Sequence, residues 1–294
     1  MHPNYFIMIH RDLLQVVENQ LFSGKAIVLI GARQVGKTTL LTTLVQNQNI
    51  ALRMLNCDEP ETRNLLTDAN LSRLALLLGD AKMLIIDEAQ KVDNIGLTLK
   101  LLVDNFKDVQ VIASGSSAFE LRNRLNEPLT GRKWEYCLYP ISSNELIQTF
   151  GLAEEQKLLE NRLIYGSYPE IINHPEHAKQ TLNELTQSYL YKDILSLGNI
   201  RKPQVVEKLL QALAFQVGSE VSVNELSRLL QVDNKTIDSY IDLLEKCYVI
   251  FQLSGLSRNL RSELKKSRKI YFYDNGVRNA VIQQFAPLQL RNDT

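Results

Sequence analysis

The chain has 294 residues, of which 45% are hydrophobic and 22% are charged, proportions that are ordinary for folded globular proteins and exclude fibrous and disordered classes. Its 33 basic and 33 acidic residues cancel, so the net charge supplies no argument for binding to nucleic acid or to a membrane. No apolar run approaches the roughly 18 residues that a membrane span requires, and the N-terminus lacks the layout of a signal peptide, so we expect a cytoplasmic protein.

The first part of the chain alternates between short apolar runs and segments with helical spacing. Strands are expected at residues 26–30, 51–55, 83–86, 109–113 and 134–138, and helices at 37–46, 71–78 and 96–106. Such alternation predicts a parallel sheet with helices on both faces, the α/β class. Pro140 follows the last strand, and a first domain is therefore predicted over residues 1–140.

Two further segments follow this domain. Residues 141–202 have helical spacing almost throughout, which predicts a helical lid or bridge. In residues 203–294 we expect a helix at 204–216, a short extended stretch at 221–223, helices ending near 230 and 246, and strands at 248–253 and 269–273. This order predicts a winged helix-turn-helix domain.

A phosphate-binding loop lies between the first expected strand and the helix after it. The sequence from Gly31 to Thr38 fits the pattern G-x-x-x-x-G-K-[ST], the Walker A motif. Its glycines let backbone N–H groups converge on a phosphate, while Lys37 would neutralise phosphate oxygens and Thr38 would ligate magnesium. We therefore expect ATP and Mg²⁺ to bind here, through Gly31, Ala32, Arg33, Gln34, Val35, Gly36, Lys37, Thr38 and Thr39.

Two carboxylates end the strand expected at 83–86, as in a Walker B motif. Asp87 and Glu88 follow the apolar run, at a strand end that would lie beside the phosphate loop. We expect Asp87 to hold magnesium and Glu88 to be the base that polarises the attacking water, with Gln90 helping to orient that water. A second acid at this place favours hydrolysis over transfer to a bound acceptor.

A turn of small residues follows the strand at 109–113. Ser114 or Ser116 would sense the γ-phosphate from this turn, and Ser116 is the catalytic candidate. The alternative is a turn that is merely rich in small residues.

Several motifs in order along the chain carry a family resemblance. They are GARQVGKTTL, IIDEAQ, the GSS turn, Leu129-Thr130-Gly131-Arg132, Tyr139-Pro140-Ile141-Ser142, Tyr168-Pro169-Glu170 and Tyr271-Phe272-Tyr273-Asp274-Asn275-Gly276. Over essentially its whole length the chain resembles a prokaryotic family of AAA+-type ATPases. The resemblance implies an ATPase core, a helical segment and a winged helix, usually followed by a restriction-endonuclease-like domain of unassigned function. The chain stops at Asn292-Asp293-Thr294, where that domain would begin, so we expect it to be either truncated or naturally short.

Arg132 matches the Gly-Arg pair of that family and comes just before the last expected strand. As an arginine finger it would act on a nucleotide of its own subunit or of a neighbour, the second case requiring a homo-oligomer. A salt bridge that ties the strand to the helical segment is the alternative. Arg122 and Arg124 are weaker candidates.

Double-stranded DNA is a candidate partner of the predicted winged helix. A major-groove contact would use the start of the helix that ends near 246, with Lys235 and Thr236, although Asp233, Asp238 and Asp242 on the same helix would repel phosphates. The segment between the last two strands is more strongly cationic, with a single acid and six cations: Arg258, Arg261, Lys265, Lys266, Arg268 and Lys269. Such a cluster suits a phosphate backbone, but a solvated loop is the alternative.

We therefore expect an ATP-hydrolysing switch or motor that acts through a winged helix on DNA. The alternative is a signalling or scaffold ATPase whose winged helix binds protein. A third hypothesis, a nucleotide-dependent kinase, predicts transfer of phosphate to an acceptor.

Overall fold

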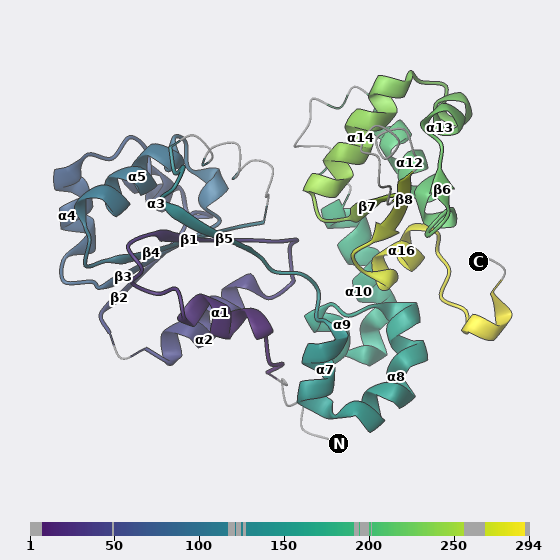
Figure 1. The fold of residues 1–294 in the computed structure, drawn as a ribbon, viewed down its shortest axis with the longest axis horizontal. Coiled ribbons are helices and arrows are strands. Elements are labelled where there is room, and N and C mark those ends of the chain that lie inside the picture. The colour runs from purple at the N-terminus through teal and green to yellow at the C-terminus, as the bar shows by residue number, and fades with distance from the viewer. Residues whose placement is uncertain are drawn as a thin grey trace. The chain divides into compact units, whose positions relative to one another are not determined.

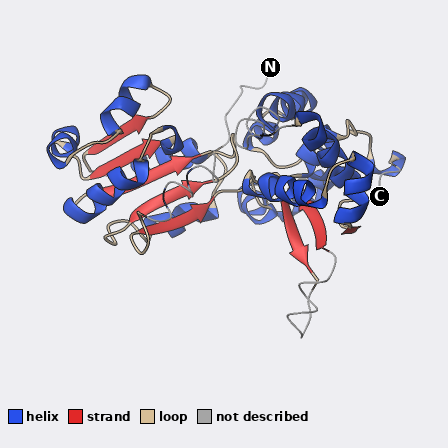
Figure 2. Cartoon of the chain, turned by 90° about the horizontal axis from the view of Figure 1, so that it is seen from above, coloured by secondary structure: helices blue, strands red, loops and turns tan. Residues whose placement is uncertain are grey.

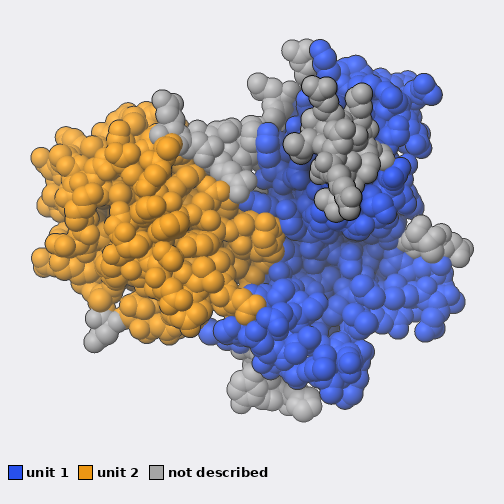
Figure 3. All heavy atoms as spheres, viewed as in Figure 1, with its two compact units in different colours: residues 1–10, 140–294 blue, residues 11–139 orange. Residues whose placement is uncertain are grey.

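The computed structural model describes residues 8–48, 50–116, 128–190, 202–255 and 268–291, together with residues 121, 125, 194 and 200. Contacts divide the chain into two compact units, which Figure 3 colours separately. We call residues 11–139 the first unit (orange, unit 2 in the key of Figure 3) and residues 1–10 with 140–294 the second unit (blue, unit 1 in that key). Within the residues so described, no helix is long and apolar enough to cross a membrane.

The described residues of the unit 11–139 form a five-stranded parallel sheet with the strand order β2-β3-β4-β1-β5. Its strands are β1 (Ala26–Ile30), β2 (Leu52–Asn56), β3 (Met83–Asp87), β4 (Gln110–Gly115) and β5 (Lys133–Cys137). Figure 1 shows helices on both faces of this sheet, α1 (Asp12–Glu18) and α2 (Lys37–Gln46) on one, and α3 (Pro60–Leu66), α4 (Leu71–Leu78) and α5 (Ile95–Asn105) on the other. The parallel α/β core predicted from the sequence is confirmed.

The central strands follow from their apolar sequences. Every residue of β1, β3 and β4 is buried, as expected for strands covered by helices on both faces, whereas the edge strands β2 and β5 are partly exposed. Although β4 comes after β1 and β3 in the sequence, it lies between them and pairs with both. The carboxyl ends of these three strands are therefore neighbours at one edge of the sheet.

The second unit begins with helices and ends with a mixed segment. The capping box of Ser142 and Glu145 starts α7. The helical elements that follow one another are α7 (Ser143–Phe150), α8 (Leu152–Tyr165), α9 (Pro169–Asn173), η2 (Pro175–His177), α10 (Ala178–Glu184) and η3 (Leu185–Leu190). After them come α12 (Pro203–Phe215), β6 (Glu220–Val221), α13 (Val223–Leu230), α14 (Asn234–Lys246), β7 (Ile250–Ser254), β8 (Arg268–Phe272), α16 (Asn275–Val281) and η4 (Leu288–Leu290). The three described strands are antiparallel in the order β6-β8-β7, and Figure 2 shows β7 and β8 side by side.

Helix α16 packs against α8, which joins the helical segment to the C-terminal segment. The side-chain amide of Asn279 donates to the carbonyl oxygens of Leu163 (3.0 Å) and Ile164 (2.7 Å) at the end of α8. A Cβ at Gly276 would lie only 2.2 Å from the carbonyl oxygen of Tyr165, so this close approach requires glycine. Segments that the sequence predicted separately, 141–202 and 203–294, thus belong to one compact unit.

The buried carboxylate of Asp274 stabilises this contact between α16 and the end of α8 through two hydrogen bonds. One carboxylate oxygen accepts from the Val277 N–H (3.0 Å) and caps α16, and the other accepts from the Ser167 N–H (2.7 Å). Burial raises the pKa of Asp274 to about 6, and the backbone N–H donors offset part of that rise. Gly166 has φ +75°, and a Cβ there would lie 2.1 Å from Asp274 Oδ1. The carboxylate therefore occupies space that only a glycine leaves open.

Substituting alanine at Gly166 should destabilise the second unit more than the same change at Gly151. Both glycines have positive φ, +75° and +87°, so each variant should lose about 1–3 kcal/mol through backbone strain. Only Gly166→Ala also drives a methyl group into Asp274, which adds about 1–3 kcal/mol of overpacking. Urea unfolding measured by circular dichroism compares the two variants, and equal losses would contradict this account of Gly166.

Candidate nucleotide-binding site

The loop of residues 31–38 connects the carboxyl end of β1 to the start of α2. Gly36 is the N-cap of α2 with φ +94°, a left-handed conformation that suits glycine, and the helix has no side-chain cap. A Cβ at Gly31 would lie 2.2 Å from the carbonyl oxygen of Leu138, just after β5. The glycines of the motif are thus required at these positions, and the uncapped helix start has the polarity that favours an anion.

Lys37 is folded into the loop. Its side chain is buried, and Nζ donates to the carbonyl oxygens of Gly31 (3.0 Å) and Ala32 (2.8 Å). Burial lowers the pKa of Lys37 to about 8, an effect that the carboxylates of Glu88 and Asp87 partly offset. The ammonium group is therefore poorly solvated, and an anion in the loop would stabilise it.

Asp87, the last residue of β3, joins the loop to β4. Its Oδ2 accepts from Thr38 Oγ1 (3.0 Å), and its Oδ1 accepts from the hydroxyl of Ser114 and from the Glu88 N–H (3.1 Å). Asp87 and Ser114 are both buried. The oxygens of Thr38 and Asp87 are the hard ligands that magnesium prefers, so these side chains fit the metal expected from the sequence.

Glu88 turns away from the line of the strand. Its φ of +53° is unusual for a residue other than glycine, and such a conformation occurs where surrounding contacts hold it. Its Oε2 accepts from Ser116 Oγ (2.8 Å) and from Gln90 Nε2 (2.6 Å). The carboxyl edge of the sheet thus carries a phosphate-type loop, a carboxylate beside its threonine, and a second carboxylate held by a serine and a glutamine.

Comparison with known families agrees with this geometry. Residues 23–147 match the family model of an AAA domain. These residues are therefore similar to an AAA domain, and we call them the AAA domain below. A second family model, described as a domain of unknown function, matches residues 156–288, and so covers most of the helical segment together with the C-terminal segment.

Relatives extend beyond the AAA domain. The chain is 26% identical over 208 residues to an uncharacterized protein of Haemophilus influenzae, which covers 67% of this chain and 52% of the relative. It is 25% identical over 288 residues to an uncharacterized protein of Methanocaldococcus jannaschii, covering 91% of this chain and 64% of the relative. The chain therefore spans about half to two thirds of the length of these curated relatives.

A solved structure has the same fold over most of the chain. The Walker-type ATPase of Pyrococcus abyssi matches with a TM-score of 0.66 and 15% sequence identity, over 94% of this chain and 96% of that one. At this identity the likeness shows the fold alone.

The other residues of the phosphate loop that were predicted to contact the nucleotide fall into a buried and an exposed group. Ala32 and Val35 are buried, whereas the other candidates for nucleotide contacts are exposed: Arg33, Gln34, Thr38 and Thr39. The exposed side chains are therefore the ones that a ligand can reach from solvent.

Arg132 lies where the strands of the sheet begin, whereas the phosphate loop lies at their carboxyl ends. It precedes β5, and its carbonyl oxygen accepts from the N–H of Ala26 at the start of β1. The length of a five-residue strand, roughly 16 Å at 3.3 Å per residue, separates that end of the sheet from the loop. Arg132 Nε instead donates to Asp104 Oδ1 of α5 (2.7 Å), and this bond lowers the pKa of Asp104. The salt bridge therefore joins α5 rather than the helical segment, and the arginine finger stays a prediction.

Half of the predicted DNA-contact residues lie among the described residues. Arg258, Arg261, Lys265 and Lys266 fall outside them, as do Arg122 and Arg124. Arg268 donates to Gln252 Oε1 (2.7 Å) and pairs with Asp238 of α14, so a phosphate would have to displace these partners. The Thr236 hydroxyl donates to Asp233 (2.7 Å) as part of the cap of α14, while Lys235 and Lys269 are exposed.

Arg11 is a site residue that the sequence analysis missed. One guanidinium nitrogen donates to the carbonyl oxygen of Val35 in the phosphate loop (2.7 Å), and another donates to that of Tyr139 after β5 (2.6 Å). Residue spacing carries no signal for such a bond, because it links the first residue of the compact unit 11–139 to its last.

The buried charge of Lys37 predicts a specific pH dependence of stability. Its pKa is about 8 in the folded chain against 10.5 for an ordinary lysine, so between these values the unfolded chain binds more protons and stability rises with pH. Below pH 8 the cost of the buried charge, about 3 kcal/mol, is present in full. The stability of wild type relative to Lys37→Met should therefore increase from pH 8 to pH 10.

Fluorescence of Trp134, the single tryptophan, follows urea unfolding of the AAA domain at each pH. Lys157→Met, at an exposed lysine of α8, is the matched control. A difference between wild type and Lys37→Met that does not vary with pH would contradict the burial of this charge.

Proposed function

We propose that the AAA domain binds ATP with magnesium and hydrolyses it. The observation that supports this most directly is the placement of Asp87 and Glu88 beside the phosphate loop, with Asp87 bonded to Thr38 (3.0 Å). Binding would exchange the contacts of Lys37 with two loop carbonyls for contacts with phosphate oxygens. Because phosphate carries full negative charge, that exchange stabilises the ammonium group.

Thr38 and Asp87 are the residues that would hold magnesium, Asp87 directly or through water. When bound, the metal supplies positive charge that neutralises phosphate oxygens. The hydroxyl of Ser114 and the Glu88 N–H fix the other carboxylate oxygen of Asp87, so its orientation is set before any ligand arrives.

Glu88 would act as the general base. As the oxygen of a water molecule bonds to the γ-phosphorus, the bond from that phosphorus to the β–γ bridging oxygen breaks and ADP leaves. The water proton passes to Glu88. Ser116, hydrogen-bonded to Glu88 (2.8 Å), would then sense the γ-phosphate from the turn after β4, the role that the sequence analysis gave to Ser114 or Ser116. Transfer to a small-molecule acceptor is the competing reaction, and hydrolysis without any acceptor separates the two.

Hydrolysis should depend on Glu88 and binding on Lys37. Glu88→Gln keeps the shape and hydrogen bonding of the side chain but removes the base, so the ATPase rate should fall by about 10²–10⁴ while ATP binding persists. Lys37→Ala should lose binding as well. Phosphate release measures hydrolysis, and titration with a fluorescent nucleotide measures binding. If the Lys37→Ala variant hydrolysed ATP at the wild-type rate, the proposal would be overturned.

The C-terminal segment of the second unit is proposed to be a winged helix that binds double-stranded DNA. Support comes from the order α12, β6, α13, α14, β7, β8 with its three-stranded antiparallel sheet, which is the order of a winged helix-turn-helix. Lys235 near the start of α14 and Lys269 on β8 are exposed, and the chain between β7 and β8 is rich in cations. ATP hydrolysis would then switch or drive the action of this segment on DNA.

A protein partner is the alternative, and salt dependence distinguishes it. Changing Lys235, Lys265, Lys266 and Lys269 to alanine should weaken duplex binding for all sequences and flatten the plot of log affinity against log salt by up to about 0.9 per lost phosphate contact. Lys157→Ala, on α8, is the control. If the chain does not bind duplex DNA at low salt, the signalling or scaffold function is favoured instead.

A separate proposal concerns Arg132, which would act on the nucleotide of a neighbouring subunit if the chain forms a homo-oligomer.

A further inference from the structure

We propose that Gln90 is the positioning residue for the catalytic base Glu88, and that it acts by holding one carboxylate oxygen together with Ser116. This inference rests on the proposed hydrolysis of ATP. It assigns the task of Gln90 to the base itself rather than to the attacking water.

The hydrogen bonds among the three side chains form a closed ring. Gln90 Nε2 donates to Glu88 Oε2 (2.6 Å) and to Ser116 Oγ (3.1 Å), and Ser116 Oγ donates in turn to Glu88 Oε2 (2.8 Å). A glutamine amide has two N–H donors, and a serine hydroxyl has one. All three protons are therefore used inside the ring, and Gln90 has no donor left for a water molecule.

The ring assigns different tasks to the two oxygens of Glu88. Oε2 accepts two hydrogen bonds, so its lone pairs are largely committed. Oε1 is then the oxygen that accepts the water proton. The left-handed backbone at Glu88 (φ +53°) adds strain that these bonds offset, which makes the position of the carboxylate dependent on its two partners.

Gln90 itself is tightly confined. Its side chain is 4% exposed, and its Oε1 is buried without a hydrogen-bond partner in the part of the chain that the structure describes. A Cβ at Gly115 would lie 2.5 Å from this oxygen. A buried acceptor without a partner is unfavourable, so a simple packing role would be served better by an apolar side chain of similar size.

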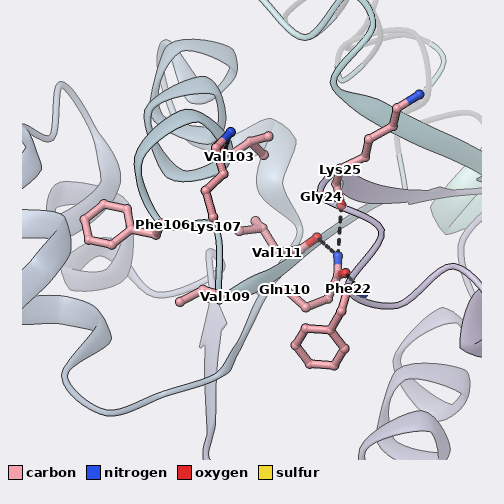
Figure 4. Close-up of a pocket in the computed structure, with 9 residues that line it drawn as sticks. All are labelled: Phe22, Gly24, Lys25, Val103, Phe106, Lys107, Val109, Gln110 and Val111. Carbon is pink, nitrogen blue, oxygen red and sulfur yellow. Dashed lines mark hydrogen bonds between the residues drawn. The ribbon is translucent and has the colours of Figure 1, made fainter.

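Gln110 provides a matched control, because it lies at the start of β4, whereas Gln90 lies near the end of that strand. It is also buried and also bonded through its amide, to the carbonyl oxygens of Lys25 (3.1 Å) and Val111 (2.9 Å). Its Oε1 accepts from the Phe22 N–H (2.6 Å). Figure 4 shows Gln110 among these residues, at the amino end of β4 and hence at the edge of the sheet opposite the phosphate loop.

The test compares Gln90→Met with Gln110→Met in the full chain. Methionine preserves length and removes the donors, so Gln90→Met should lower kcat at least about tenfold, within the range of base catalysis, with KM and the Kd for ATP changed by less than about twofold. Such a split marks loss of an interaction made for the chemical step. Gln110→Met should leave kcat per nucleotide-binding site unchanged. Equal kcat for Gln90→Met and wild type would overturn the inference.

Gly115→Ala tests the same geometry with Gln90 intact. Its methyl group would push against Gln90 Oε1 and should reproduce the fall in kcat without loss of ATP binding. Wild type and Glu88→Gln are measured alongside. If wild type hydrolyses ATP and Glu88→Gln does not, while both Gln90→Met and Gly115→Ala keep the wild-type kcat, the inference fails and the proposed function stands. If wild type does not hydrolyse ATP, both fail.

Discussion

The carboxylate of Asp87 is the interaction on which the candidate site depends. It accepts from Thr38 on α2, from Ser114 on β4 and from the Glu88 N–H beyond its own strand. Three elements that are distant in sequence are thereby held at one edge of the sheet. This is feasible because β4 lies between β1 and β3, which brings Ser114 of β4 within reach of Asp87, and Ser116, just after β4, within reach of Glu88.

The same site contains three features that lower the stability of the folded chain and that the rest of the fold must offset. Lys37 is buried with a lowered pKa, Glu88 has a left-handed backbone, and Gln90 keeps an acceptor without a partner among the described residues. Each feature alone is destabilising. Their concentration around one loop is typical of a site organised for a charged ligand, and the apolar central strands provide the stability that tolerates it.

Much of the fold and of the candidate site could be predicted from local sequence patterns. The loop, the buried strands and the two carboxylates each depend on neighbouring residues, so the parallel core followed from the sequence and was confirmed. Contacts between distant residues carried no such signal. For Arg132 the motif left open an arginine finger and a salt bridge to the helical segment, and only the structure shows that the ion pair is made with Asp104 of α5. Likewise α3 and α16, seven residues each, are too short for a periodic pattern, and the burial of Asp274 beneath Gly166 depends on tertiary packing alone.

Arg11 has a mechanical consequence. The chain passes between its two compact units twice, after residue 10 and after Tyr139. Arg11 begins one passage, bonds to the last residue before the other, and bonds to Val35 within the phosphate loop. One side chain thus ties the phosphate-type loop to the start of one linker and to the end of the chain before the other. A change in the conformation of this loop at Val35 would therefore alter the hydrogen bonding of Arg11 beside both linkers.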